Sequence, residues 1–297
     1  MLSAMKKYVW LFLLTVVVIL PLSGEAQEKH SLWRVDSPTN TVYLLGSLHM
    51  LKQAHYPLRP ALEAAFSDAR HLVTEANVDE LESPTVLAEI MQKAAYPSGA
   101  SLQASISQKA YQLTEHVVVD FEAMGVNMGV LNGLKPWFVS ITLVGLKLQQ
   151  LGFSPSSGID RYFFKKAKDS GMGLHALETS SFQINLLSSL SEQDQELMLL
   201  QTLKELEVTE KLFDEMYTTW RDGDTDGLAT LLSESFREYP AVYEKLIVAR
   251  NRNWVPRIES YLKQEENYVV VVGAGHLVGE DSVVQMLTSK GYGVDQL

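Results

Sequence analysis

Two short motifs of the form Gly-x-x-His lie near opposite ends of the chain, at Gly46–His49 and Gly273–His276. Each follows an apolar run that predicts a buried β-strand. Glycine lets the chain turn sharply after a strand and lets the backbone come close to a ligand. A single histidine after a strand is more often a hydrogen-bonded structural residue. Two such motifs, each on a buried strand, favour a functional site.

Two carboxylates occupy the same kind of position. Glu75 follows the β segment 72–74, and Glu178 follows the β segment 175–177. Ligands of open α/β sheets collect outside the carboxyl ends of the strands. If the four strands are parallel neighbours, two imidazoles and two carboxylates converge there. This donor set suits a divalent ion such as Zn²⁺, Mn²⁺ or Co²⁺.

The chemistry of such a site assigns roles to these residues. A metal-bound water has a pKa near neutrality and becomes a nucleophile when a carboxylate takes its proton. We therefore predict His49, His276 and Glu75 as metal ligands, and Glu75, Glu178 and Arg250 as catalytic residues. Arg250 could stabilise an oxyanion or bind a substrate carboxylate. The spacing leaves open whether each glutamate is a ligand, a general base or a salt-bridge partner, and whether Arg250 is a surface charge of its helix.

The elements that position these residues follow from hydrophobic periodicity. Strands are expected over 32–35, 41–45, 71–76, 174–178 and 268–272. The region from about 81 to 264 is mostly helical and is interrupted by the core strand near 174–178. Asp160 stands where one helix begins and is expected to cap it. This order predicts an α/β fold (α+β-like), with a central β-sheet formed from N- and C-terminal strands and a large, mostly helical insertion.

Composition excludes several classes of function. The 297-residue chain has a formal net charge of −11, and phosphate binding needs clustered Lys and Arg, so we expect no nucleic-acid partner. The short basic stretch 165–168 is expected to be a solvated helix face. The chain has no cysteine, which excludes disulfides, thiolate zinc sites and a cysteine nucleophile. The oligomeric state is not readable from the sequence.

The N-terminus has the pattern of a secretory signal. Lys6 and Lys7 precede an apolar run over 8–22, and small residues follow at Gly24 and Ala26. We predict a signal peptide over residues 1–26 with cleavage after Ala26, and hence a periplasmic or secreted protein without a stable membrane span. The alternative is an uncleaved anchor, although the run is shorter than the ~20 residues that a spanning helix needs.

Several blocks of sequence resemble the TraB/GumN family, which includes the Tiki metalloproteases and is related to the erythromycin-esterase and ChaN-like proteins. The blocks that carry the resemblance are Tyr43–His49, Glu75, Lys135–Trp137, Gly158–Asp160, Leu177–Thr179 with Gln183, Arg250–Asn251 and Val272–Gly279. The resemblance implies one domain over 27–297 with a metal-dependent hydrolase core. In Tiki proteins it implies a peptidase supported by Mn²⁺ or Co²⁺, with His49, Glu75, Arg250 and His276 as the matching site residues.

Three functions are compatible with these observations. The first is an exported metal-dependent hydrolase, most readily a peptidase that acts on a peptide or protein. The second is a non-catalytic protein that captures a peptide, a pheromone or another ligand in the same crevice. The third is a hydrolase of esters. Family resemblance supports the site far better than it supports the substrate.

Overall fold

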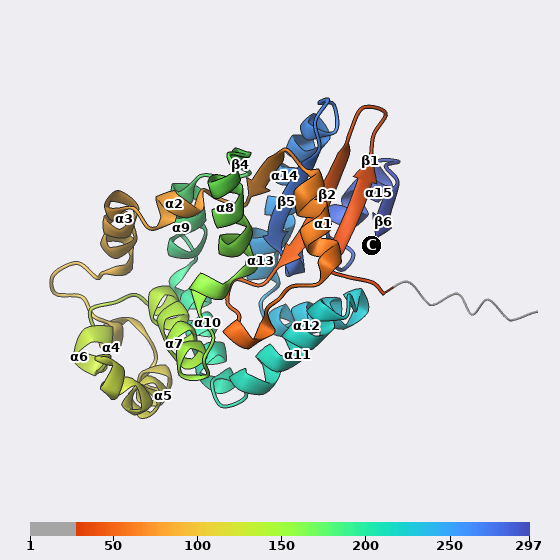
Figure 1. Cartoon of the computed structure of the whole chain (residues 1–297). Coiled ribbons are helices and arrows are strands. Elements are labelled where there is room, and N and C mark those ends of the chain that lie inside the picture. Colours follow the sequence, from red (N-terminus) through yellow and green to blue (C-terminus); the bar gives the residue numbers. More distant parts are fainter. Residues whose placement is uncertain (1–27) are drawn as a thin grey trace, which may run out of the picture.

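A computed structural model describes residues 28–297, and it contains a six-stranded mixed sheet with strand order β4-β3-β5-β2-β1-β6 (Figure 1). The strands are β1 (Leu32–Asp36), β2 (Thr41–Ser47), β3 (His71–Thr74), β4 (Gly173–Ala176), β5 (Tyr268–Gly273) and β6 (Val294–Gln296). Strands β4, β3, β5 and β2 are parallel neighbours, whereas β1 pairs antiparallel with β2 and with β6. The expected α/β fold, with strands from both ends of the chain and a helical middle, is confirmed.

The pairing of β2 with β5 brings the two Gly-x-x-His motifs together. Their register aligns Gly46 with Val272 and Ser47 with Gly273, so both strands end at the same edge of the sheet. Residues Tyr268 to Val272 are all buried, as expected for a parallel strand that helices cover on both faces. Two motifs more than 200 positions apart in the sequence therefore lie on adjacent strands, which are about 4.8 Å apart.

The strand predicted over 174–178 differs from the observed one. β4 ends at Ala176 and is the edge strand of the sheet, and the side chains of Leu174 and His175 are exposed. An edge strand has a neighbour on one side only, which explains why its burial is low although its sequence is apolar. Beyond β4 the chain stays beside the end of β3, because Leu177 and Glu178 donate backbone hydrogen bonds to Thr74 and Glu75.

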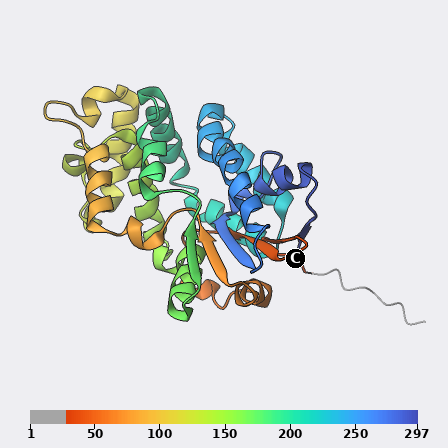
Figure 2. The ribbon, with the colours of Figure 1, turned by 90° about the horizontal axis from the view of Figure 1, so that it is seen from above.

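Helices cover both faces of the sheet. In the view from above, α14 (Ala249–Tyr261) and α15 (Val283–Ser289) lie on one face, and α1 (Pro60–Asp68) and α8 (Ile159–Ser170) lie on the other (Figure 2). Residues 250, 254 and 258 form a buried stripe along α14 at helical spacing. The first turn of α14 therefore presents its inward side chains to the end of β5.

The helical insertion has a hydrophobic core of its own, which includes Phe121, Leu131, Trp137, Leu143 and Leu199. Its helices are α2 (Val78–Leu81), α3 (Pro84–Ala94), α4 (Leu102–Ser105), α5 (Gln108–Val118), α6 (Met128–Leu131), α7 (Pro136–Gln150), α9 (Ser180–Ser188) and α10 (Glu192–Glu205). The chain then returns to the sheet through α11 (Thr209–Arg221), α12 (Thr225–Phe236), α13 (Pro240–Tyr243) and a π-helical turn (Glu244–Val248). Short 3₁₀ turns occur at Gln53–His55, Val119–Met124, Pro155–Ser157 and Ala274–His276.

The predicted signal peptide, residues 1–26, lies outside the described residues. Within residues 28–297, no helix is both long enough and apolar enough to cross a membrane.

Candidate active site at the carboxyl edge of the sheet

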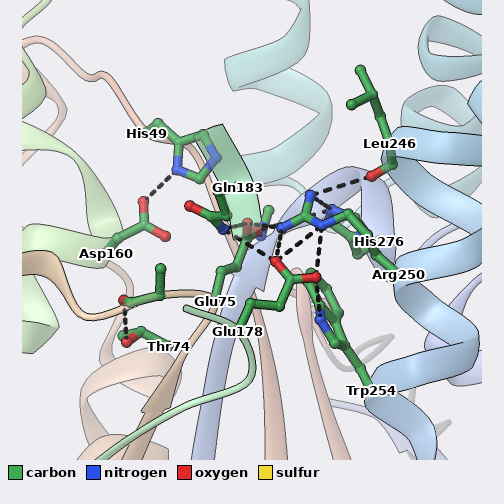
Figure 3. A network of polar contacts seen from close by, with 12 residues as sticks. His49, Thr74, Glu75, Asp160, Glu178, Gln183, Leu246, Arg250, Trp254 and His276 are labelled. Carbon is green, nitrogen blue, oxygen red and sulfur yellow. Dashed lines mark hydrogen bonds and ion pairs between the residues drawn. The ribbon is translucent and has the colours of Figure 1, made fainter. Parts of the chain in front are cut away.

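Side chains that follow the ends of four parallel strands meet at the carboxyl edge of the sheet (Figure 3). A β-carbon added at Gly273 would lie 3.3 Å from Oε1 of Glu75, 3.6 Å from Cδ2 of His276 and 3.7 Å from Nε2 of His49. These three predicted site residues therefore face one small space, and a glycine at position 273 keeps that space open. Glu178 lies beside Glu75, and Nη2 of Arg250 and Nε2 of Gln183 each contact both carboxylates.

Asp160 fixes the orientation of His49. Its carboxylate lies 2.8 Å from Nδ1 of His49 through Oδ2, and its Oδ1 accepts a hydrogen bond of 2.7 Å from the hydroxyl of Ser47. Asp160 was expected to cap α8, but this helix has no side-chain cap, so that prediction is wrong. With Nδ1 bound, the ring directs Nε2 toward Glu75. The charge of Asp160 raises the pKa of His49 to about 9.

Asn251 fixes the orientation of His276 in a similar way. The amide nitrogen of Asn251 donates to the carbonyl of Asp281, so its Oδ1 is the acceptor for Nδ1–H of His276 at 2.7 Å. This leaves Nε2 of His276 without a proton, and it accepts a hydrogen bond of 3.0 Å from Nη1 of Arg250. Burial lowers the pKa of His276 to about 3, so the ring is neutral at pH 7.

Arg250 joins the two carboxylates. Its Nη2 lies 2.6 Å from Oε2 of Glu75 and 2.8 Å from Oε2 of Glu178, and its Nε donates to both oxygens of Glu178. The guanidinium also stacks over the ring of Trp254, 4.6 Å from its centre. The side chain is only 9% exposed, so Arg250 is not a surface charge of α14. It is the central cation of a buried network.

Glu178 and Glu75 differ in the groups that they contact. Glu178 is 5% exposed, and in addition to Arg250 it accepts hydrogen bonds from Nε1 of Trp254 at 2.9 Å and from Nε2 of Gln183 at 3.4 Å, a nitrogen that also lies 3.1 Å from Oε2 of Glu75. All these donors hold it as the counter-ion of Arg250. Glu75 instead directs Oε1 toward the open space, where it accepts the backbone N–H of Gly273 at 2.7 Å. Burial alone would raise the pKa of Glu75, but the electrostatic influence of His276 and Arg250, together with His49 and the N–H of Gly273, lowers it to about 2.

The chemistry of these donors fits a divalent metal ion. Nε2 of His49, Nε2 of His276 and the carboxylate of Glu75 form a two-histidine, one-carboxylate set, and a carboxylate or an amide oxygen holds the second nitrogen of each ring, as is usual for metal-binding histidines. In the structure the candidate ligand atoms are farther apart than they would be around a bound metal ion. Nε2 of His276 is 3.9 Å from Oε1 of Glu75, and no three His, Asp or Glu side chains in the described part of the chain are close enough together to hold a metal.

Two cavities open onto these residues. The larger has a volume of about 670 Å³ and the smaller about 380 Å³, and His49, Met50, Glu75 and Gln183 line both. The site is therefore accessible from two sides and lies where the cavities meet.

Sequence reasoning named five residues of this site and missed three. Asp160, Gln183 and Asn251 stood in the blocks that carry the family resemblance, but no spacing rule links Asp160 and Asn251 to the histidines, or Gln183 to the glutamates, that they contact. The pair Ser47 and Asp160, for example, is 113 positions apart. The signal that could have identified them is that each is a polar residue near the start of a helix that packs against the sheet or the site.

Comparison with known proteins identifies the family. The family model of the TraB/PrgY/gumN family matches residues 31–296, so the chain belongs to this family. The chain is 28% identical to the uncharacterized protein YbaP of Escherichia coli K12 over 246 residues, which cover 82% of this chain and 87% of YbaP, and the YbaP protein of Shigella flexneri matches equally well. It is 22% identical to a metalloprotease TIKI homolog of Amphimedon queenslandica, over 93% of this chain and 63% of that protein. No solved structure matches.

Proposed function

We propose that this member of the TraB/PrgY/gumN family is a metal-dependent hydrolase that cleaves amide bonds, with peptides or proteins as its first candidate substrates. The observation that carries the proposal is the convergence of His49, Glu75 and His276 above Gly273. The similarity to a protein named as a metalloprotease supports the same reaction class.

His49, His276 and Glu75 are the residues that would hold the metal ion, and the predicted set Mn²⁺, Co²⁺ or Zn²⁺ suits these donors. When bound, such an ion supplies a water molecule of near-neutral pKa and polarises a carbonyl oxygen. The tautomer of His276 leaves Nε2 free of a proton at pH 7, as a metal ligand requires.

The chain itself supplies orientation and charge around this point. Arg250 and Gly273 hold the carboxylate of Glu75 from two directions, which fixes a proton acceptor beside the reacting carbon. Glu178 holds Arg250 in turn, so Glu178 acts as a positioning residue for the guanidinium. The buried guanidinium of Arg250 is a cation of the chain itself that would add to the metal ion in stabilising the negative charge that develops on a carbonyl oxygen during hydrolysis.

We further propose that this activity operates in the periplasm or outside the cell. The signal pattern over residues 1–26 supports this location, and processing after Ala26 is testable by N-terminal sequencing of the exported protein.

The proposal is tested by metal analysis of the purified protein together with H49A and H276A. We expect about one equivalent of Mn²⁺ or Co²⁺ per chain in the wild type, a strong reduction in both variants, and no change in H116A, which removes an exposed histidine of α5. Digestion of a peptide library with each metal then measures the activity. Unchanged metal content in both site variants would contradict the proposal. Stoichiometric metal without cleavage of any peptide, other amide or ester would identify a binding protein, and cleavage of esters alone would identify an esterase.

A further inference from the structure

The larger cavity has apolar walls and a polar floor. Helices α9, α11 and α12 and the π-helical turn contribute the walls, which include Leu187, Phe213, Met216, Leu231, Leu232 and Phe236. The charged side chains that line this cavity lie at its floor, where Glu75 pairs with Arg250 and His49 pairs with Asp160. A charged ligand group held between the apolar walls, away from the floor, would lose its hydration without gaining a hydrogen-bond or ion-pair partner. The walls therefore select a hydrocarbon group.

The smaller cavity on the other side of the site is of different character. Its lining mixes polar residues with apolar ones: Thr74, Asp160, Arg161 and Gln183 lie on it together with Ala76, Val78, Leu81 and Pro155. It has little more than half the volume of the larger cavity. A molecule that extends through both cavities would have its apolar part among the leucines and its polar part beside Asp160 and Arg161. The bond between these two parts would lie at His49 and Glu75, which border both cavities.

The walls of the larger cavity favour an acyl chain over a peptide segment. A peptide that enters must pair its own N–H and C=O groups, which in peptide-binding proteins is commonly achieved at a sheet edge. Here the edges are β4 and β6, whereas the site lies at β3, β5 and β2 in the interior of the sheet. The surrounding helices bond their own backbone groups internally. A hydrocarbon chain has no polar groups to pair.

We propose that the substrates are amphiphiles in which a long acyl chain is joined to a polar group by an amide or ester bond, with the chain in the larger cavity and the polar group in the smaller one. The volume of about 670 Å³ is in the usual range of 300–1,000 Å³ for small-molecule sites. In the reaction the bond from the acyl carbon to nitrogen or oxygen breaks. Water supplies hydroxyl to the acyl carbon and a proton to the leaving group, which gives a carboxylic acid and an amine or alcohol. This inference rests on the proposed hydrolase function.

Binding is the first test, because it needs neither metal nor turnover. N-acylglycines with chains of 4 to 12 carbons are titrated into the metal-free full-length protein by calorimetry, below their micelle concentrations. We expect the dissociation constant to fall about four-fold per added methylene, as transfer of about 0.8 kcal/mol per CH₂ implies. The same affinity for all chain lengths, or equal affinity for an uncharged apolar peptide without an acyl chain, would overturn the inference.

Two wall variants locate the binding. L232E places a carboxylate over Gly275, whose added β-carbon would lie 3.1 Å from Leu232, and M216E places one on α11. Both should lose the dependence on chain length, whereas L113E on the exposed side of α5 should retain it. Melting temperatures show whether each variant is folded, and the chain-length series of the wild type tests the inference even if both wall variants unfold. Retention of the dependence in folded L232E and M216E would exclude this cavity.

Turnover separates this inference from the proposed function. N-acylglycines and the corresponding O-acyl esters are incubated with the Mn²⁺- and Co²⁺-loaded protein, and release of the fatty acid is measured. Cleavage of the N-acylglycines that becomes faster with chain length supports both proposals. The same dependence for the esters alone supports the acyl-chain cavity and identifies an esterase, which contradicts the proposed cleavage of amides. Chain-length-dependent binding without any cleavage would contradict the hydrolase and leave the acyl-chain cavity in place. Cleavage of short peptides, with no dependence on acyl-chain length, would support the hydrolase and contradict the acyl-chain cavity.

Discussion

Replacement of Gly273 by alanine should impair metal binding at the site much more than it lowers the stability of the fold. The added methyl group would lie 3.3 to 3.7 Å from side-chain atoms of Glu75, His276 and His49, which is at or close to ordinary van der Waals contact. The backbone of Gly273 has φ −50° and ψ 133°, a conformation that alanine adopts without strain. The folding cost should therefore be at or below the low end of the ~1–3 kcal/mol typical of overpacked positions. At about 2–4 °C per kcal/mol, the melting temperature should fall by a few degrees at most.

The effect of G273A on the site should be much larger than its effect on folding. A metal ion bonds to its nitrogen and oxygen ligands at roughly 2.0–2.2 Å, so a methyl group among the three donors takes up the space that the ion needs. We expect metal affinity to fall by at least about 100-fold, the upper end of the losses seen when only the outer partners of ligands change. Hydrolysis should fall in parallel.

The assay for G273A combines a thermal melt with a metal titration. G145A is the matched control, because an added β-carbon at Gly145 meets no atom within 4 Å and this residue lies in α7, outside the site. It should keep both metal affinity and activity. Wild-type metal affinity in folded G273A would refute the argument that the three donors share the space above this residue, and unfolding of G273A would refute the estimate of its packing cost.

Three further predictions concern the polar network. R250M should lower the free energy of unfolding by about 3–5 kcal/mol, because it leaves the buried carboxylates of Glu75 and Glu178 without their cation; a loss below about 1 kcal/mol in urea titrations would contradict this burial. D160N should bring the pKa of His49 down from about 9 toward 6.5 in the metal-free protein, which an NMR titration of the imidazole measures; an unchanged pKa would show that another group sets it. The pKa of His276 is about 3 in the folded protein, below its ordinary value of 6.5, so the unfolded chain binds this proton at a higher pH than the folded protein does. The metal-free protein should therefore lose stability as the pH falls from 6.5 toward 3, by at most about 1.4 kcal/mol per pH unit. Melts of H276N should show a smaller dependence over the same window, and equal slopes would contradict the assignment.

The sequence predicted those parts of the site that depend on strand ends. Parallel strands share one carboxyl edge, so the apolar runs followed by His49, Glu75 and His276 predicted that these residues converge if their strands are parallel neighbours. The observed order β4-β3-β5-β2 meets this condition. The buried character of β5 was readable from its five consecutive apolar residues.

Other features depend on contacts between distant positions. Whether β4 would be central or at the edge is decided by strand order, which its own apolar residues do not encode. The role of Asp160 was taken for a local helix cap, whereas its partners are Ser47 and His49, which are more than 100 positions away. The apolar cavity arises where several helices from the middle of the chain come over the sheet, and periodicity alone assigns those leucines to a packed core.

The central claim is that His49, His276 and Glu75 hold one divalent ion. X-ray absorption spectroscopy of the protein loaded with one equivalent of Co²⁺ tests it most directly, because imidazole ligands give a distinctive multiple-scattering pattern. We predict two imidazoles together with oxygen ligands in the wild type, and one imidazole in H49A and in H276A. A wild-type spectrum with oxygen ligands alone, or one that both variants leave unchanged, would contradict the claim.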